Sequence, residues 1–135
     1  GGYRAMKMAL KNAHINAESI NYINAHGTST PLGDEIEYGA VKRLFEGNLS
    51  NIFMSSTKSS TGHLLGASGA IESIFSILTL KEKILPPTLN LDNPSDDCRE
   101  INLIPHESIN YKSDFVLSNS FGFGGTNVSL VFKKI

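Results

Sequence analysis

The sequence has little of several residue types on which whole classes of protein depend. It contains one cysteine and no tryptophan among 135 residues, so it can form neither an internal disulfide nor a thiolate metal cage. Its four histidines match no His-x-x-x-His spacing, so we expect no metal site. Twelve basic and thirteen acidic residues give a net charge of −1, which excludes the basic footprint typical of nucleic-acid binding.

Long apolar runs are also missing. No uninterrupted apolar stretch approaches the roughly 18 residues that a membrane span requires. The opening residues 1–5 are not followed by the apolar core of a secretion signal, so we expect a cytoplasmic protein without a membrane partner. The length suits one domain. Because the sequence lacks an initial methionine and opens almost at once into a helical pattern, we expect it to be part of a longer protein.

The spacing of apolar residues predicts an α/β domain with a mixed sheet. Helices are expected at 3–13, from a cap at Asp34 to Gly47, and at about 66–83, with a Ser/Thr-rich loop through Thr61. The stretch 88–108 is polar and should hold at most one short strand. The last two strands are joined too closely for a parallel crossover, which makes the sheet mixed. The predicted strands are 20–25, 52–54, 114–118 and 127–132.

Two helices have apolar patterns that predict how they pack. In the second helix a single stripe should face the core, formed by Ile36, Ala40, Val41, Leu44 and Phe45. In the helix at 66–83 apolar residues surround most of the circumference, so we expect it to be largely buried rather than half-exposed.

Polar loops follow or link the predicted strands at 26–30, 55–63 and 119–127, where sites gather in α/β sheets. His26 comes directly after the first strand, and His63 precedes the apolar helix. Residue type and position alone leave open whether each is structural or functional. His14 and His106 lie in polar surroundings and are expected at the surface.

No nucleophile is evident among these residues. The Ser-x-x-Lys pattern at 55–58 lacks the companion motifs of serine acylases. The glycine run 121–125 lacks the ending of a phosphate-binding loop, but it can form a mobile turn whose N–H groups face a developing anion. Cys98 is surrounded by three carboxylates and one arginine, which disfavours a thiolate.

Three motifs, at 24–34, 56–67 and 119–127, together resemble the C-terminal signatures of the beta-ketoacyl-[acyl-carrier-protein] synthases, most closely the type II elongating enzymes. The resemblance extends over essentially all of the chain but only the second half of the family's length. It implies a thiolase-like C-terminal domain over residues 1–135, with a mixed five-stranded sheet and helices on both faces. The N-terminal domain that carries the family's nucleophilic cysteine is absent, and Cys98 matches no nucleophile motif.

The resemblance also implies a reaction and the residues that serve it. The reaction is a decarboxylating Claisen condensation of malonyl-carrier protein with an acyl-cysteine thioester, without a cofactor. The matched positions are His26 and His63 as the catalytic histidines and Lys58 as the active-site lysine. Glu72 is expected to form a buried ion pair with Lys58. An alternative for this pair is that it only braces the loop carrying His63.

Further positions match residues that contact the carrier arm and the acyl chain. Thr28 and Thr30 match residues that bind phosphopantetheine, and Phe123 matches the gate of the acyl pocket, whose N–H forms part of the oxyanion hole. The partners implied are acyl carrier protein, the missing N-terminal half and a second copy in a homodimer. This chain alone should be inactive. The alternative is a non-catalytic partner subunit, which would be expected to have lost the histidines or the gate. The first helix and the helix at 66–83 should face the missing half.

Overall fold

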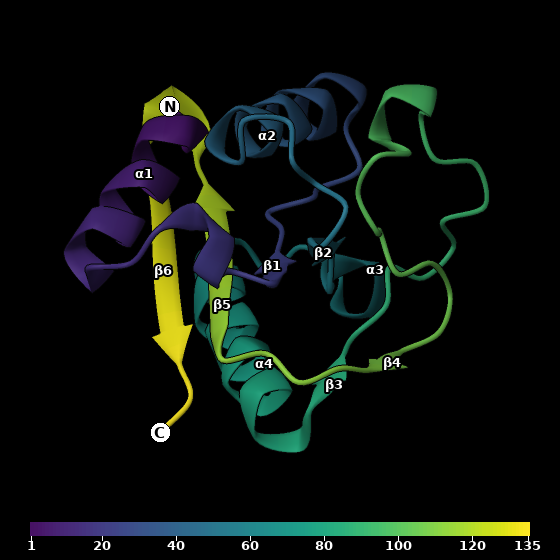
Figure 1. Ribbon diagram of the computed structural model, residues 1–135. Helices are drawn as coiled ribbons and strands as arrows, with labels where there is room; N and C mark the ends of the chain where they lie inside the picture. The colour runs from purple at the N-terminus through teal and green to yellow at the C-terminus, as the bar shows by residue number, and fades with distance from the viewer.

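A four-stranded mixed sheet runs through the middle of the structure, a computed structural model that describes residues 1–135 (Figure 1). The strand order is β2-β1-β5-β6; the first three strands are parallel and β6 runs antiparallel to β5. The mixed sheet was therefore predicted correctly. The strands are β1 (Tyr22–Asn24), β2 (Phe53–Ser55), β5 (Phe115–Phe121) and β6 (Asn127–Lys133).

The expected fifth strand is not part of this sheet. Two short strands, β3 (Ile84–Leu85) and β4 (Ile109–Asn110), pair with each other in a separate antiparallel sheet. The long segment between them adds only single bridges, from Asn102 to Phe53 and from Pro105 to Thr88. Proline has no N–H to donate, which limits ladder formation along this segment.

Helices cover both faces of the main sheet (Figure 1). Helices α1 (Gly2–Ala13) and α2 (Pro31–Leu44) lie on one face, and α4 (Ser68–Glu82) lies on the other. Strand residues alternate between the two faces: Ile23 packs with α1 and α2 in the larger core, whereas Tyr22 packs with Leu80 of α4 in the smaller one. None of the helices combines the length and apolar character that a membrane span requires.

Helix α2 begins earlier than the sequence predicted. Its N-cap is Thr30 and not Asp34, and Pro31 occupies the first helical position. Proline suits that position because its fixed φ is already helical and its missing N–H would have had no partner there. Asp34 falls in the first turn, where its carboxylate accepts the N–H of Ser29 at 3.2 Å. Most of the predicted stripe faces the core: Val41 and Phe45 are buried, and Ala40 and Leu44 pack against them. Ile36 is the exception, because it is exposed while Glu37 beside it is buried.

Apart from Leu80, the side chains that helix α4 buries are polar, and several of its apolar side chains are exposed. Ser68, Glu72 and Ser76 are buried, whereas Ile74 and Ile77 are about half exposed. Leu78 is exposed as well. The prediction of a largely buried helix is therefore wrong for these 135 residues. Helix α1 buries Met6 and Leu10 in the chain's own core, so only α4 shows the apolar outer face expected of both helices.

The remaining segments are short. A helix, α3 (Lys58–Thr61), occupies the end of the Ser/Thr-rich stretch that was expected to be a loop. Four single 3-10 turns complete the structure, at Ala17–Ser19, Leu65–Ala67, Asp96–Cys98 and Phe123–Gly125.

Candidate active site

The polar loops predicted to carry the chemistry meet at one edge of the sheet, where the parallel strands β1, β2 and β5 end. This is the edge at which α/β sheets bind ligands. His26 follows β1 by two residues, and its ring centroid lies 5.6 Å from that of His63 in an edge-on arrangement. The ring of Phe121, the last residue of β5, lies 5.9 Å from His26. Residues up to 95 positions apart in sequence are thus brought together.

Beside the histidines is a cavity of about 400 Å³. Of the predicted site residues, Thr28, Lys58 and His63 line it. Thr30 does not line the cavity; it is exposed at the N-cap position of α2, where its side chain makes no capping bond. The rest of the lining is mostly small or polar, including Ser56, Ser59, Thr88 and Asn90. Such a lining suits a ligand that carries hydrogen-bonding groups.

His26 is held in the neutral form. Burial, together with the nearby positive charge of Lys58 and the neighbouring His63, lowers the pKa of its imidazole to about 4; burial is the largest of the three causes. Its Nδ1 is buried without a hydrogen-bond partner in this chain. At neutral pH His26 therefore carries one ring hydrogen and no charge.

Glu37 of α2 fixes the backbone that carries His26. Its two carboxylate oxygens accept the N–H groups of His26 and Gly27, each at 2.9 Å. Burial raises the pKa of the Glu37 carboxyl, and these two bonds together with one from Asn119 oppose that rise. Ser129 of β6 donates in turn to Asn119 at 2.8 Å. Three elements, α2, β5 and β6, thus hold the histidine loop in one position.

The sequence pattern does not single out Glu37, because this residue directly follows Ile36 of the predicted apolar stripe. The loop also requires a glycine next to the histidine. A Cβ at Gly27 would stand 2.6 Å from Cβ of Ser56, and its φ is +36°. The Ser56 hydroxyl donates to the Gly27 carbonyl at 2.6 Å, so the loops that follow β1 and β2 are joined directly.

His63 has both of its internal partners on one ring nitrogen. The N–H of Leu65 donates to Nδ1 at 3.2 Å, and the hydroxyl of Ser68 lies 2.9 Å from the same atom. A backbone N–H can only donate, so Nδ1 carries no hydrogen and the ring hydrogen is on Nε2. No group of the chain bonds Nε2, which is therefore free to donate to a ligand.

Lys58 and Glu72 form the expected buried ion pair. The ammonium bonds Glu72 Oε1, and the two side chains are only 4 % and 1 % exposed. Burial raises the pKa of the Glu72 carboxyl, and the lysine opposes that rise. Glu72 Oε2 is buried without a partner. The positive charge of Lys58 also lowers the pKa of His26. The ion pair therefore acts on the electrostatics of the site, in addition to any support that it gives to the loop carrying His63.

The two phenylalanines of the glycine run occupy different environments. Phe121 is partly buried against His26, whereas Phe123 is fully exposed in the 3-10 turn that follows. Gly124 and Gly125, with φ of +76° and +85°, adopt backbone conformations that side chains rarely take. The exposed ring of Phe123 is thus attached to a turn made of glycines, as a movable gate would need.

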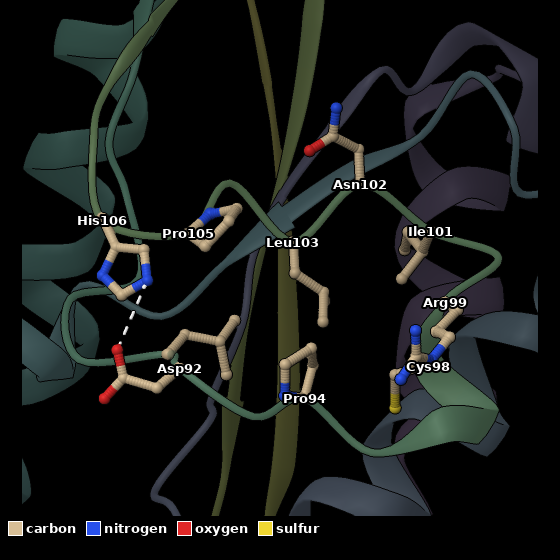
Figure 2. Close-up of a pocket in the computed structure, with 10 residues that line it drawn as sticks. Asp92, Pro94, Cys98, Arg99, Ile101, Asn102, Leu103, Pro105 and His106 are labelled. Atoms are coloured by element: carbon tan, nitrogen blue, oxygen red, sulfur yellow. Dashed lines mark ion pairs between the residues drawn. The ribbon is translucent and has the colours of Figure 1, made fainter.

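A second pocket, of about 350 Å³, is formed by the segment between β3 and β4. Figure 2 shows Leu103 and Pro94 in its middle, with Cys98 toward one end and the His106–Asp92 pair, 3.5 Å apart, at the other. It contains none of the predicted site residues. Burial and neighbouring carboxylates, Asp97 first among them, raise the pKa of the Cys98 thiol, so the sole cysteine is a poor nucleophile.

Comparison with known proteins identifies the family. Residues 1–92 match the model of the beta-ketoacyl synthase C-terminal domain. The chain therefore belongs to the beta-ketoacyl synthase family, as part of its C-terminal domain.

Individual relatives are similar over nearly the whole chain. It is 58 % identical over 134 residues to 3-oxoacyl-[acyl-carrier-protein] synthase 2 of Rhizobium meliloti strain 1021, covering 99 % of this chain and 31 % of that protein. A crystal structure of a beta-ketoacyl synthase from Burkholderia phymatum STM815 superposes with a TM-score of 0.92 at 42 % identity, over 98 % of this chain and 32 % of that one.

A third relative is a ketosynthase of a type II PKS, solved in complex with its acyl-carrier protein and bound to the hexaketide. It superposes with a TM-score of 0.95 at 36 % identity, over 100 % of this chain and 33 % of that one. The chain thus spans about a third of the length of the relatives it matches.

Proposed function

We propose that this chain supplies the decarboxylating histidines of a 3-oxoacyl-[acyl-carrier-protein] synthase that elongates acyl chains in fatty acid biosynthesis. The observation that carries the proposal is the pair His26 and His63. Their ring centroids lie 5.6 Å apart beside a polar cavity. His26 is neutral, and His63 carries its ring hydrogen on Nε2, the nitrogen that no group of the chain bonds. Two neutral imidazoles can together donate two hydrogen bonds to one oxygen.

In the proposed reaction the malonyl thioester oxygen lies between these two donors. The bond from the malonyl methylene carbon to the carboxylate breaks, CO₂ leaves, and the electron pair remains as an enolate whose oxygen the two N–H groups stabilise. The methylene carbon then attacks the acyl thioester, and the cysteine thiolate departs. The backbone N–H of Phe123 would stabilise the second oxyanion, since its glycine-rich turn can bring that group to the acyl carbonyl.

The thiolate that carries the acyl chain belongs, in this proposal, to a part of the protein outside these 135 residues. Cys98 lies in the separate pocket, and its raised pKa disfavours the thiolate at neutral pH. The isolated chain should therefore show no condensing activity. Loss of the histidines or the gate, which a non-catalytic partner subunit would be expected to show, is not observed: His26, Lys58, His63 and Phe123 are all present.

The proposal includes a cytoplasmic location and three binding partners. Acyl carrier protein would place its phosphopantetheine arm past Thr28, in the cavity wall, and Thr30, at the nearby start of α2. The N-terminal half would cover the apolar face of α4 around Ile74 and Ile77, which solvent reaches in this chain. A second copy would complete a homodimer.

The test compares histidine variants of the full-length protein that contains this chain. His26→Ala and His63→Ala should each lower malonyl-carrier decarboxylation by at least about 100-fold, within the range of lost oxyanion donors. His14→Asn is the matched control, because His14 is exposed and its backbone is left-handed, a conformation that asparagine tolerates. Full decarboxylation by either alanine variant would refute the proposal.

A further inference from the structure

We propose that Ser68 is a positioning residue for His63, and that its hydroxyl holds the imidazole in the tautomer that the reaction uses. The inference deepens the proposed function and rests on it. No sequence motif pointed to Ser68, which is the first residue of α4.

The hydrogen-bond pattern determines which atom donates. The hydroxyl oxygen of Ser68 lies 2.9 Å from Nδ1 of His63, and the N–H of Leu65 approaches the same nitrogen at 3.2 Å. Since Leu65 can only donate, the lone pair of Nδ1 must be the acceptor. The hydroxyl of Ser68 therefore points its hydrogen at Nδ1 as well.

Two donors that converge on one ring nitrogen select a tautomer. If Nδ1 carried the hydrogen, the N–H of Leu65 would face that hydrogen and lose its acceptor, and the Ser68 hydroxyl would have to turn from donor to acceptor. With the hydrogen on Nε2, both bonds form, and Nε2–H remains available beside the cavity that His63 lines. The proposed enolate stabilisation requires that Nε2–H group.

The Ser68 hydroxyl has no hydrogen-bond partner in this chain other than His63. Serine at a helix start often caps the helix, but here Ala67 is the N-cap and no side chain caps this end. Ser68 is 2 % exposed, and His63 is its only side-chain hydrogen-bond partner. A buried hydroxyl without a partner would be unfavourable.

The backbone of Leu65 supports the same reading. Its φ is +52°, a left-handed conformation that is strained for leucine, and its side chain is exposed. Apolar contacts of this residue therefore do not explain the strain. The conformation directs the N–H toward Nδ1, and strain of this kind concentrates at functional sites. Ser68 and Leu65 act on the same atom from opposite ends of one turn.

The test is Ser68→Ala in the full-length protein, with Ser76→Ala as the matched control. Ser76 is a fully buried serine two turns further along the same helix, and its hydroxyl bonds only the carbonyl of Glu72. Two readouts are needed: the ¹⁵N resonances of the His63 ring, and kcat and KM for malonyl-carrier decarboxylation.

We expect Ser68→Ala to move the Nδ1 resonance of His63 and to lower kcat about three- to tenfold with KM nearly unchanged, as for one lost hydrogen bond. Ser76→Ala should change neither readout. An unmoved Nδ1 resonance, an unchanged kcat, or an equal loss in Ser76→Ala would overturn the inference. If the parent protein decarboxylates nothing, the proposed function fails, whereas the ring resonances still report whether Ser68 bonds His63.

Discussion

Replacing Glu72 with glutamine should leave the Lys58 ammonium buried without a counter-charge, and the fold should lose much of its stability. The carboxylate is the ammonium's only partner, and the lysine side chain is 4 % exposed. Removing one member of a buried ion pair costs about 3–5 kcal/mol. Glutamine keeps the volume and one oxygen, so the loss reflects the charge and not a cavity.

The reverse change should cost less. In Lys58→Met the remaining Glu72 can take up a proton, because burial raises the pKa of its carboxyl and the lysine no longer opposes that rise. A neutral carboxyl without a partner costs about 1–3 kcal/mol. Since the folded state then holds a proton that the unfolded chain releases at lower pH, the cost should shrink as the pH falls from 8 toward 5.

The double variant Lys58→Met/Glu72→Leu completes the cycle. It leaves no buried charge, so it should recover most of the loss caused by Glu72→Gln. The assay is urea unfolding of the full-length protein at pH 8 and pH 5.5, with the slope checked for each variant. A loss below about 1 kcal/mol for Glu72→Gln, or a double variant less stable than both single ones, would refute the reasoning.

Four other predictions concern separate parts of the chain. His26 should titrate in the folded protein with a pKa of about 4, which ¹H NMR would check. Because the unfolded chain takes up this proton at a higher pH, the folded state should lose stability as the pH falls from about 6.5 to 4, which unfolding at each pH would check. Glu37→Ala should lower decarboxylation at least about tenfold, since it frees the backbone of the His26 loop; activity equal to the parent would contradict this. Cys98→Ser should leave full condensing activity in the full-length protein, and inactivity would instead point to this thiol. In the full-length protein, Ile77→Asp should place a charge on the face of α4 that the N-terminal half is proposed to cover, and the unfolding midpoint should fall. Lys81→Asp, at an exposed position of the same helix, should leave the midpoint unchanged.

Much of the fold could be read from apolar spacing. The order of helices and strands, the mixed sheet and the extent of α1 followed from local pattern, because each of these depends on neighbouring residues in the chain. The start of α2 was displaced by a few residues, since Pro31 can open a helix as well as interrupt one. The missing fifth strand and the exposed face of α4 could not be derived, because strand partners and helix faces depend on segments distant in sequence.

The candidate site divides in the same way. The motifs identified His26, His63 and Lys58, and the position of Glu72 early in the apolar helix suggested it as the lysine's partner. Glu37 and Ser68 were not predicted, because the buried face of each helix was inferred from its apolar residues, whereas these two buried residues are polar. Ser68, Glu72 and Ser76 recur every four residues, which was the signal that a polar stripe faces inward.

The sequence by itself determined which chemistry this chain can take part in: two histidines, a lysine and a glycine turn are present, and no activated thiol is. Only the tertiary structure decided how those groups behave. Burial beside Lys58 keeps His26 neutral, and two donors on one nitrogen set the hydrogen of His63. These properties arise from dielectric environment and hydrogen-bond direction, which are fixed when distant segments pack together and are not encoded in any single motif.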